Sequence, residues 1–280
     1  MSKPIVLITG CSQGGIGYAL AKKFAQEGNH VIATARRIEA MEGLEAFGCD
    51  KEVLDVLDKD SIETTIQKII DNFGHIDILV NNAGAPAVGA LMDIDLETAH
   101  RCINTNVFGV LLVTRSVAKH MAKKGKGKIV NIGSVVGYVS TPWAGTYALS
   151  KAAVHSMSDT LRLELKPFGI QVTVVAPGAI ISNIGDAGKR SVTVPEDSLY
   201  SSVANYIIAR ATLSQGPNST PTDVFASHVV KKILRPISPS YITFGATSWL
   251  FLLFYYLPFF IKDFLFYKRF GVDQIKKKHE

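Results

Sequence analysis

Short apolar runs alternate with helix-length segments through the first 180 residues of this chain, and no other feature restricts its fold as strongly. Runs rich in Val, Ile and Leu predict strands at 5–8, 31–35, 52–54, 76–80, 129–132 and 171–175. Helices are expected between them, at 18–26, 61–72, 110–123 and 147–166. The runs do not alternate strictly between apolar and polar residues, which is typical of parallel strands covered on both faces. This order predicts an α/β fold with a doubly wound parallel sheet.

Length and composition fit a single domain followed by a tail of a different kind. The chain has 280 residues, 47% of them hydrophobic and 19% charged, which excludes intrinsic disorder and a disulfide scaffold. Neither its three cysteines nor its histidines are spaced as metal ligands, so no metal is expected. We expect the domain to span residues 1–246, with a last strand at 241–244 and a substrate lid at 183–222. Within the lid, 199–211 is the best candidate for a helix.

A glycine-rich segment at 9–17 follows the first predicted strand and precedes a helix. Backbone N–H groups at a helix N-terminus attract a pyrophosphate, and side chains there would keep the phosphates away. This context predicts a dinucleotide-binding Rossmann fold, although tight turns also use glycine for conformational reasons. After the second strand, Arg36 and Arg37 stand where an NAD site usually has an acid. Two guanidinium groups suit a 2′-phosphate, so NADPH is predicted; two solvated surface arginines are the alternative.

Three polar residues predict a proton-transfer site. Ser134 follows a strand, and Tyr147 and Lys151 are four positions apart, which places them on one face of a helix. The ammonium group of Lys151 would favour the phenolate and lower the pKa of Tyr147 from about 10 toward neutrality. Tyr147 could then donate a proton to a carbonyl oxygen as a hydride arrives at the carbon. Ser134 would hydrogen-bond the same oxygen.

Together these residues resemble the short-chain dehydrogenase/reductase family. The three polar residues match its Ser…Tyr-x-x-x-Lys triad, and residues 81–84 match its Asn-Asn-Ala-Gly motif. Asn106 matches the asparagine of a catalytic tetrad, and 177–178 match the Pro-Gly turn that holds the nicotinamide. The resemblance covers residues 5–182 and implies an oxidoreductase in which Asn106 holds a water that relays protons to Lys151.

The resemblance also implies which residues hold the cofactor. Asp55 would lie by the adenine and Asn82 by the adenosine ribose, while Ile180 and Ser182 would meet the carboxamide. Two departures stand out: the glycine-rich loop is one residue longer than usual, and Ser182 replaces a frequent Thr. The full set of expected cofactor contacts is Gly10, Ser12, Gly15, Ile16, Gly17, Arg36, Arg37, Asp55, Asn82, Gly84, Arg115, Tyr147, Lys151, Pro177, Gly178, Ile180 and Ser182.

Within the family, the chain resembles the membrane-associated NADPH-dependent 1-acyldihydroxyacetone-phosphate reductases. The similarity rests on the loop at 11–17, Ala-Arg-Arg at 35–37, Lys-Pro-Phe at 166–168 and an aromatic tail. It implies reduction of a lipid-like ketone to lysophosphatidic acid, with Lys189 and Arg190 of the lid as candidates for pairing with the phosphate. Two solvated loop cations are the alternative for that pair. A steroid or retinoid dehydrogenase, or a non-catalytic NADPH-binding membrane protein, is the alternative for the whole chain.

The end of the chain predicts contact with a membrane surface. Of 25 Phe, Trp and Tyr residues, 12 lie at 244–270, and 262–280 carry six Lys or Arg against three Asp or Glu. Pro258 interrupts the apolar run at 245–261, which is too short for the hydrocarbon core. We expect 247–280 to lie on a membrane without spanning it, facing the cytosol, at the endoplasmic reticulum or a lipid droplet. A nucleic-acid partner is not expected; a hydrophobic homo-oligomer interface is the alternative.

Overall fold

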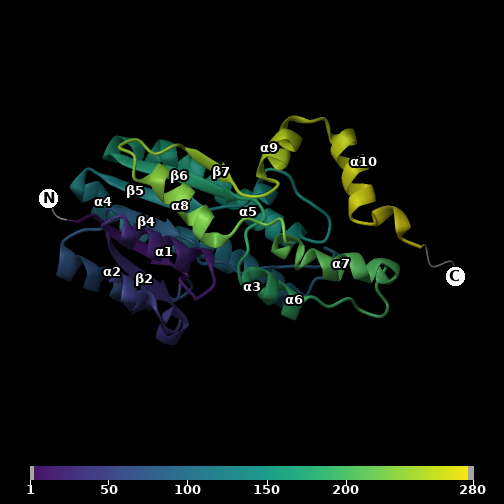
Figure 1. The fold of residues 1–280 in the computed structure, drawn as a ribbon, viewed down its shortest axis with the longest axis horizontal. Helices are drawn as coiled ribbons and strands as arrows, with labels where there is room; N and C mark the ends of the chain where they lie inside the picture. Colours follow the sequence, from purple (N-terminus) through teal and green to yellow (C-terminus); the bar gives the residue numbers. More distant parts are fainter. Residues whose placement is uncertain (1–2, 277–280) are drawn as a thin grey trace.

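In the computed structural model, which describes residues 3–276, seven parallel strands form one sheet in the order β3-β2-β1-β4-β5-β6-β7 (Figure 1). The doubly wound parallel sheet predicted from the sequence is therefore confirmed. Each predicted strand is present, and its ends differ from the expected ones by two residues at most. The strands are β1 (Ile5–Thr9), β2 (His30–Ala35), β3 (Asp50–Val53), β4 (Ile78–Asn81), β5 (Gly127–Ile132), β6 (Ile170–Pro177) and β7 (Tyr241–Phe244).

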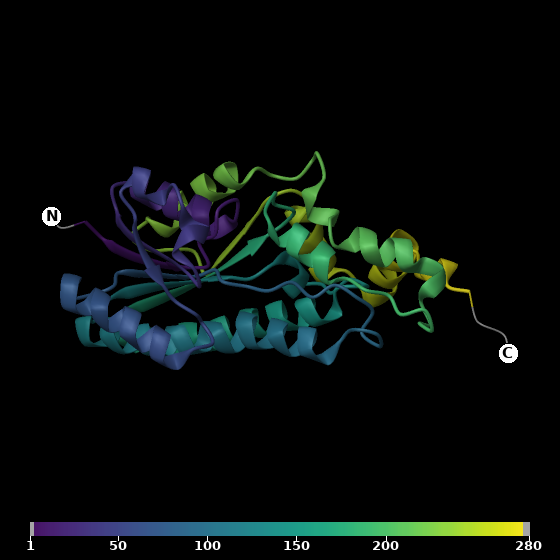
Figure 2. The same ribbon diagram turned by 90° about the horizontal axis from the view of Figure 1, so that it is seen from below.

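Helices cover both faces of the sheet (Figure 2). The helices α1 and α8 pack together on one face, where Phe24 and Phe225 are fully buried. The helices α2, α4 and α5 cover the other face, where Ile66 of α2 and Val113 of α4 are buried. Because the strands are buried on both sides, they consist mainly of continuous apolar residues. The helices are α1 (Ile16–Gln26), α2 (Lys59–Phe73), α3 (Leu96–Ile103), α4 (Gly109–Lys124), α5 (Gly145–Glu164), α6 (Ile184–Ser191), α7 (Ala204–Arg210), α8 (Thr222–Ile233), α9 (Ser248–Tyr256) and α10 (Phe259–Arg269).

The strand order reverses at β1, which pairs with β2 on one side and β4 on the other. In open parallel sheets, ligands bind beyond the carboxyl ends of the strands at such a point. Thr9 ends β1, and its hydroxyl oxygen accepts hydrogen bonds from the backbone N–H groups of Asn82 and Ala83, at 3.0 and 3.1 Å. These bonds tie together the two loops that border the reversal.

The lid predicted at 183–222 contains two short α-helices, α6 and α7. The helix expected at 199–211 is present as α7, preceded by a 3₁₀ turn at Ser201–Val203. In α6 the side chains at 186, 187, 190 and 191 lie outside the described part of the structure.

The C-terminal segment forms two helices rather than one. Its predicted break at Pro258 is confirmed: α9 ends at Tyr256, Leu257 is extended with ψ 149°, and Pro258 precedes α10. Among the described residues, no helix is both long and apolar enough to cross a membrane. After α10 the chain returns to the body, where Phe270 is buried with Trp143 and Ile207. The end of the tail thus packs beside the lid, as Figure 2 shows for α10 and α7.

Candidate active site

The glycine-rich loop closes over the carboxyl end of β1. Gly10 has φ +74°, and a Cβ there would lie 2.7 Å from the Cα of Ala83. A Cβ on Gly17 would collide with the side-chain amide of Asn82 and the carbonyl oxygen of Gly10. That amide donates hydrogen bonds to the carbonyl oxygens of Thr9 and Gly10, both at 2.9 Å. Asn82 therefore supports the loop from behind, and its contact with a ribose stays a prediction.

The N-terminus of α1 suits an anion. Gly15 is its N-cap, no side chain caps it, and its first turn contains no acidic residue. No negative side chain of the helix therefore balances the positive end of its dipole or the N–H groups around Ile16. Ser12 is exposed in the same loop, and its carbonyl oxygen accepts the Gly15 N–H at 3.0 Å. A pyrophosphate fits this arrangement.

The middle of the glycine-rich loop contacts the lid. Gly14 has φ +75°, and a Cβ there would lie 2.7 Å from Oδ1 of Asn183. The Asn183 amide donates a hydrogen bond to the carbonyl oxygen of Gln13 at 2.5 Å. The absence of a side chain at Gly14 thus gives the first lid residue room to reach the phosphate loop.

The residues predicted to select the cofactor lie together at the carboxyl ends of β2 and β3. Arg36 and Arg37 follow β2 directly, and both are exposed. Within residues 3–276 neither forms an ion pair. Asp55 follows β3, and its carboxylate accepts the N–H of Leu57 at 3.0 Å. Two guanidinium groups without a carboxylate partner fit a 2′-phosphate.

Tyr147 and Lys151 lie on one face of α5, beside the end of β5. The Lys151 ammonium is 5.6 Å from the centre of the Tyr147 ring and donates a hydrogen bond to the carbonyl oxygen of Ile132 at 2.8 Å. Ser134 follows β5 by two residues, and its hydroxyl oxygen accepts the N–H of Val136 at 3.3 Å. The structure thus gathers the predicted triad around the end of β5.

One electrostatic prediction is wrong for this structure. Burial raises the pKa of Tyr147, Cys102 raises it further, and only Arg210 lowers it. Lys151 is not among the groups that lower this pKa, and burial outweighs the effect of Arg210. Burial also lowers the pKa of Lys151, to about 8. At neutral pH Tyr147 therefore carries its proton and Lys151 is mostly charged, which suits a proton donor.

His155 supports Ser134, a role that the sequence analysis missed. It lies four residues after Lys151 on α5, and its Nε2 accepts the backbone N–H of Ser134 at 3.4 Å. Burial lowers the pKa of His155 to about 4, with Lys151 adding to the effect. The ring is therefore neutral at pH 7 and can accept this hydrogen bond. The i, i+4 spacing from Lys151 was the available signal.

Asn106 lies in a single π-helical turn, Asn104–Phe108, that joins α3 to α4. Its side chain is fully buried; Oδ1 accepts the N–H of Ala85 at 2.7 Å, and Nδ2 donates to the Ser150 hydroxyl at 2.9 Å. A Cβ on Gly84 would lie only 3.2 Å from Oδ1. Asn106 thus joins the loop after β4 to the catalytic helix, and its water relay stays a prediction.

The expected nicotinamide end follows β6. Pro177 ends that strand, and the Gly178 N–H donates to the carbonyl oxygen of Phe244 in β7 at 3.0 Å. Gln215, which no sequence pattern had marked, accepts the Ser182 N–H at 2.9 Å and donates to the carbonyl oxygen of Ile180 at 3.3 Å. The lid therefore holds both backbone groups predicted to meet the carboxamide.

Among the described side chains, neither Lys189 nor Arg115 forms a hydrogen bond or ion pair with the triad. Lys189 is exposed on α6, the Arg190 side chain lies outside the described residues, and Arg115 is exposed midway along α4. Their roles stay predictions. Instead, the cation whose charge acts on Tyr147 is Arg210 at the end of α7, which the sequence analysis missed.

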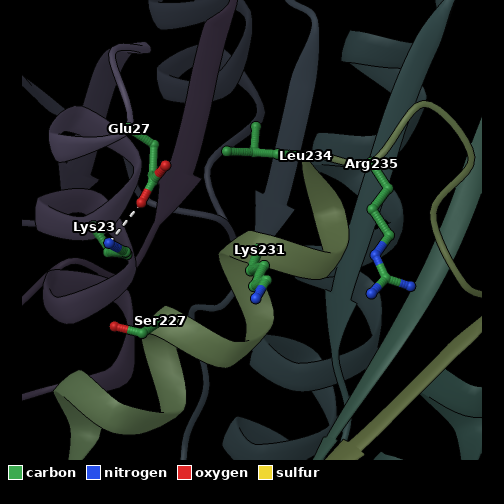
Figure 3. Close-up of a pocket in the computed structure, with 6 residues that line it drawn as sticks. All are labelled: Lys23, Glu27, Ser227, Lys231, Leu234 and Arg235. Carbon is green, nitrogen blue, oxygen red and sulfur yellow. Dashed lines mark ion pairs between the residues drawn. The ribbon is translucent and has the colours of Figure 1, made fainter.

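A surface hollow between α1 and α8 lies away from this site (Figure 3). It is lined by the ends of the two helices, where Lys23 and Glu27 form an ion pair at 2.6 Å. Because α1 starts at the carboxyl edge of the sheet, its last turn lies at the opposite edge. The hollow is therefore not part of the proton-transfer site.

The model of the short chain dehydrogenase family matches residues 4–190. The chain belongs to this family. This short-chain dehydrogenase is 41% identical over 203 residues to the NADPH-dependent 1-acyldihydroxyacetone phosphate reductase of Schizosaccharomyces pombe, covering 71% of the chain and 68% of that relative. It is 36% identical to short-chain dehydrogenase ptmH of Penicillium ochrochloron, over 98% of the chain and 100% of that relative. The resemblance stated from the sequence is confirmed.

Solved structures agree with this assignment. A short-chain dehydrogenase from Streptomyces avermitilis superposes with a TM-score of 0.80 at 28% identity, covering 98% of each chain. A gluconate 5-dehydrogenase from Burkholderia cenocepacia, in complex with NADP and tartrate, gives a TM-score of 0.63 at 29% identity, covering 75% of this chain and 87% of that one. The short-chain dehydrogenase described here is thus an oxidoreductase with the fold of that family.

Proposed function

We propose that this short-chain dehydrogenase uses NADPH to reduce the ketone of 1-acyl-dihydroxyacetone phosphate, giving 1-acyl-glycerol 3-phosphate for glycerolipid synthesis. The observation that carries the proposal is the 41% identity to the Schizosaccharomyces pombe reductase of that name. The unpaired Arg36 and Arg37 support NADPH, and the protonated Tyr147 supports ketone reduction.

Bound NADPH would supply the hydride that reaches the ketone carbon. Tyr147 donates its proton to the ketone oxygen, which becomes the alcohol oxygen of the product. Ser134 hydrogen-bonds that oxygen as negative charge develops on it, with its backbone fixed by His155. Lys151, held by the Ile132 carbonyl, keeps a positive charge beside the phenol as the proton leaves.

The test is NADPH oxidation by the full-length protein with 1-acyl-dihydroxyacetone phosphate, a ketosteroid and retinal. The proposal predicts that kcat/KM for the acyl ketone exceeds that for the other two by at least about tenfold. Higher values for the steroid or retinal would assign the enzyme to those substrates instead. Cofactor binding without oxidation in any of the three would make the chain a non-catalytic NADPH-binding protein.

We further propose that α9 and α10 lie on a cytosol-facing membrane surface, from which a lipid ketone reaches the site. Between them these helices expose seven aromatic side chains; Tyr256, Phe259 and Phe260 are 77%, 78% and 72% exposed. Aromatic rings favour the interface between lipid and water, and Lys268 and Arg269 of the last turn of α10 can meet anionic headgroups. The endoplasmic reticulum or a lipid droplet is the proposed location.

Co-sedimentation with vesicles that contain anionic lipid tests this second proposal. Replacing both Phe259 and Phe260 with Ser should reduce vesicle binding at least tenfold, because each exposed ring contributes apolar area at the interface. The matched control is Ile237→Ser, which removes an equally exposed apolar side chain (82%) outside the tail. Unchanged vesicle binding, together with a dimer that dissociates in the Phe variant, would make the tail an oligomer contact instead.

A further inference from the structure

Arg210 places a partly buried cation where its charge acts on the catalytic tyrosine. It is the last residue of α7, and its guanidinium donates one hydrogen bond, from Nη2 to the Thr141 hydroxyl at 3.3 Å. Thr141 is buried in the loop that precedes α5, four residues before the helix begins. The lid helix therefore reaches across to the wall of the proton-transfer site through this one side chain.

The protein itself satisfies only part of the hydrogen-bonding capacity of this guanidinium. Its Nε is buried and has no hydrogen-bond partner, and no carboxylate of the described residues lies within 4.0 Å of it. Burial lowers the pKa of Arg210, so its charge is held against a desolvation cost. A buried charge without a counter-charge is destabilising, and such charges are normally paired. An arginine whose side chain only covers apolar surface normally keeps its guanidinium in water.

The position of Arg210 indicates where a counter-ion would lie. Its charge acts on the Tyr147 phenol, which is the group that contacts the ketone oxygen in the proposed reaction. In an acyl-dihydroxyacetone phosphate, one methylene and one ester oxygen separate the carbonyl carbon from the phosphorus. A ketone bound at Tyr147 therefore carries its phosphate within a few bonds of the reacting carbon, in the part of the site where the charge of Arg210 acts.

We propose that Arg210 binds the phosphate of the substrate and makes the site selective for phosphorylated ketones. The planar guanidinium can offer the unpaired Nε–H and a terminal N–H as a fork to two phosphate oxygens. This inference rests on the proposed function and assigns to Arg210 the role that sequence reasoning gave to Lys189 and Arg190.

The test compares a phosphorylated acyl ketone with the same ketone lacking its phosphate. In the full-length enzyme saturated with NADPH, Arg210→Gln should lower the ratio of the two kcat/KM values by about 10- to 100-fold, the usual effect of removing charge-assisted hydrogen bonds. Arg210→Lys should restore part of the ratio, because it keeps the charge and loses the fork. Lys189→Ala, which removes an exposed cation of α6, is the control and should leave the ratio unchanged.

A second readout separates this inference from the proposed function. Titration calorimetry of the NADP-saturated protein should detect inorganic phosphate binding to wild type and at least tenfold weaker binding to Arg210→Gln. If wild type fails to reduce the acyl ketone yet binds phosphate through Arg210, the proposed function fails and the anion site stands. If Arg210→Gln lowers both kcat/KM values equally and binds phosphate as wild type does, Arg210 only positions the lid, and the inference is overturned. If Lys189→Ala alone decreased the ratio, the phosphate-binding role would belong to Lys189 of α6 instead.

Discussion

The indole N–H of Trp143 donates a hydrogen bond to the backbone carbonyl oxygen of Phe270 at 2.9 Å, across 127 residues of sequence. Trp143 has φ +65°, a left-handed conformation that is uncommon for a bulky residue, and its own carbonyl oxygen accepts the Gly89 N–H at 2.9 Å. Strained conformations of this kind persist where surrounding contacts hold them. The loop before the catalytic helix is therefore fixed in part by the end of the tail.

Replacing Trp143 with Phe should loosen the tail. The carbonyl oxygen of Phe270 loses its donor and the smaller ring leaves space, so we expect the free energy of unfolding to fall by about 1–2 kcal/mol. Limited proteolysis should also cut after α10 faster than in wild type. Trp249→Phe is the control, because Trp249 is 69% exposed and forms no such bond among the described residues. Equal effects of the two changes would show that the hydrogen bond to Phe270 is not what holds the tail.

Replacing Tyr147 with Phe should lower kcat for ketone reduction by about 10²–10⁴-fold, because only the proton donor is lost. Fluorescence titration should show that the variant binds NADPH with a Kd within about threefold of wild type. The prediction is contradicted by a variant that keeps more than about a tenth of the wild-type rate.

Replacing Arg36 and Arg37 together with Ala should raise KM for NADPH about 10- to 100-fold and change KM for NADH little. The reason is the loss of charge-assisted hydrogen bonds to the 2′-phosphate, which NADH lacks. Arg235→Ala, at the opposite edge of the sheet, is the matched control for a change in net charge. Parallel increases for the two cofactors would place the arginines away from the 2′-phosphate.

The neutral His155 predicts a loss of stability in acid. Its pKa is about 4 in the fold and near 6.5 when unfolded, so the unfolded chain binds the extra proton first as the pH falls. Stability from this group is present above pH 6.5 and decreases toward pH 4. Between pH 7 and pH 5 the loss is about 2 kcal/mol.

His155→Gln removes the titrating ring and keeps an acceptor for the Ser134 N–H. Urea unfolding at the two pH values should therefore show a smaller acid-induced decrease in the variant than in wild type, by about 2 kcal/mol. Identical decreases would mean that other groups cause the acid sensitivity, since His120 and His228 also have lowered pKa values in the fold.

The sheet could be predicted because parallel strands that are buried on both faces consist of nearly continuous apolar residues. The triad was predictable for a similar reason: Tyr147 and Lys151 share a helix, so their spacing alone brings them together. Gln215 and Arg210 could not be found this way, because they come from short lid elements whose positions depend on tertiary packing. The raised pKa of Tyr147 was missed for the same cause, since spacing indicates a neighbouring charge but not the extent of burial.

The π-helical turn at Asn104–Phe108 behaves as a one-residue insertion in what would otherwise be a continuous helix from α3 into α4. Deleting one residue there would allow regular α-helical hydrogen bonding and, by itself, a more stable helix. The same deletion would rotate everything on one side of the turn by about 100°, and Asn106 would lose either Ala85 or Ser150. A variant lacking one residue of this turn would therefore gain a more regular helix and lose a contact that joins the loop after β4 to the catalytic helix.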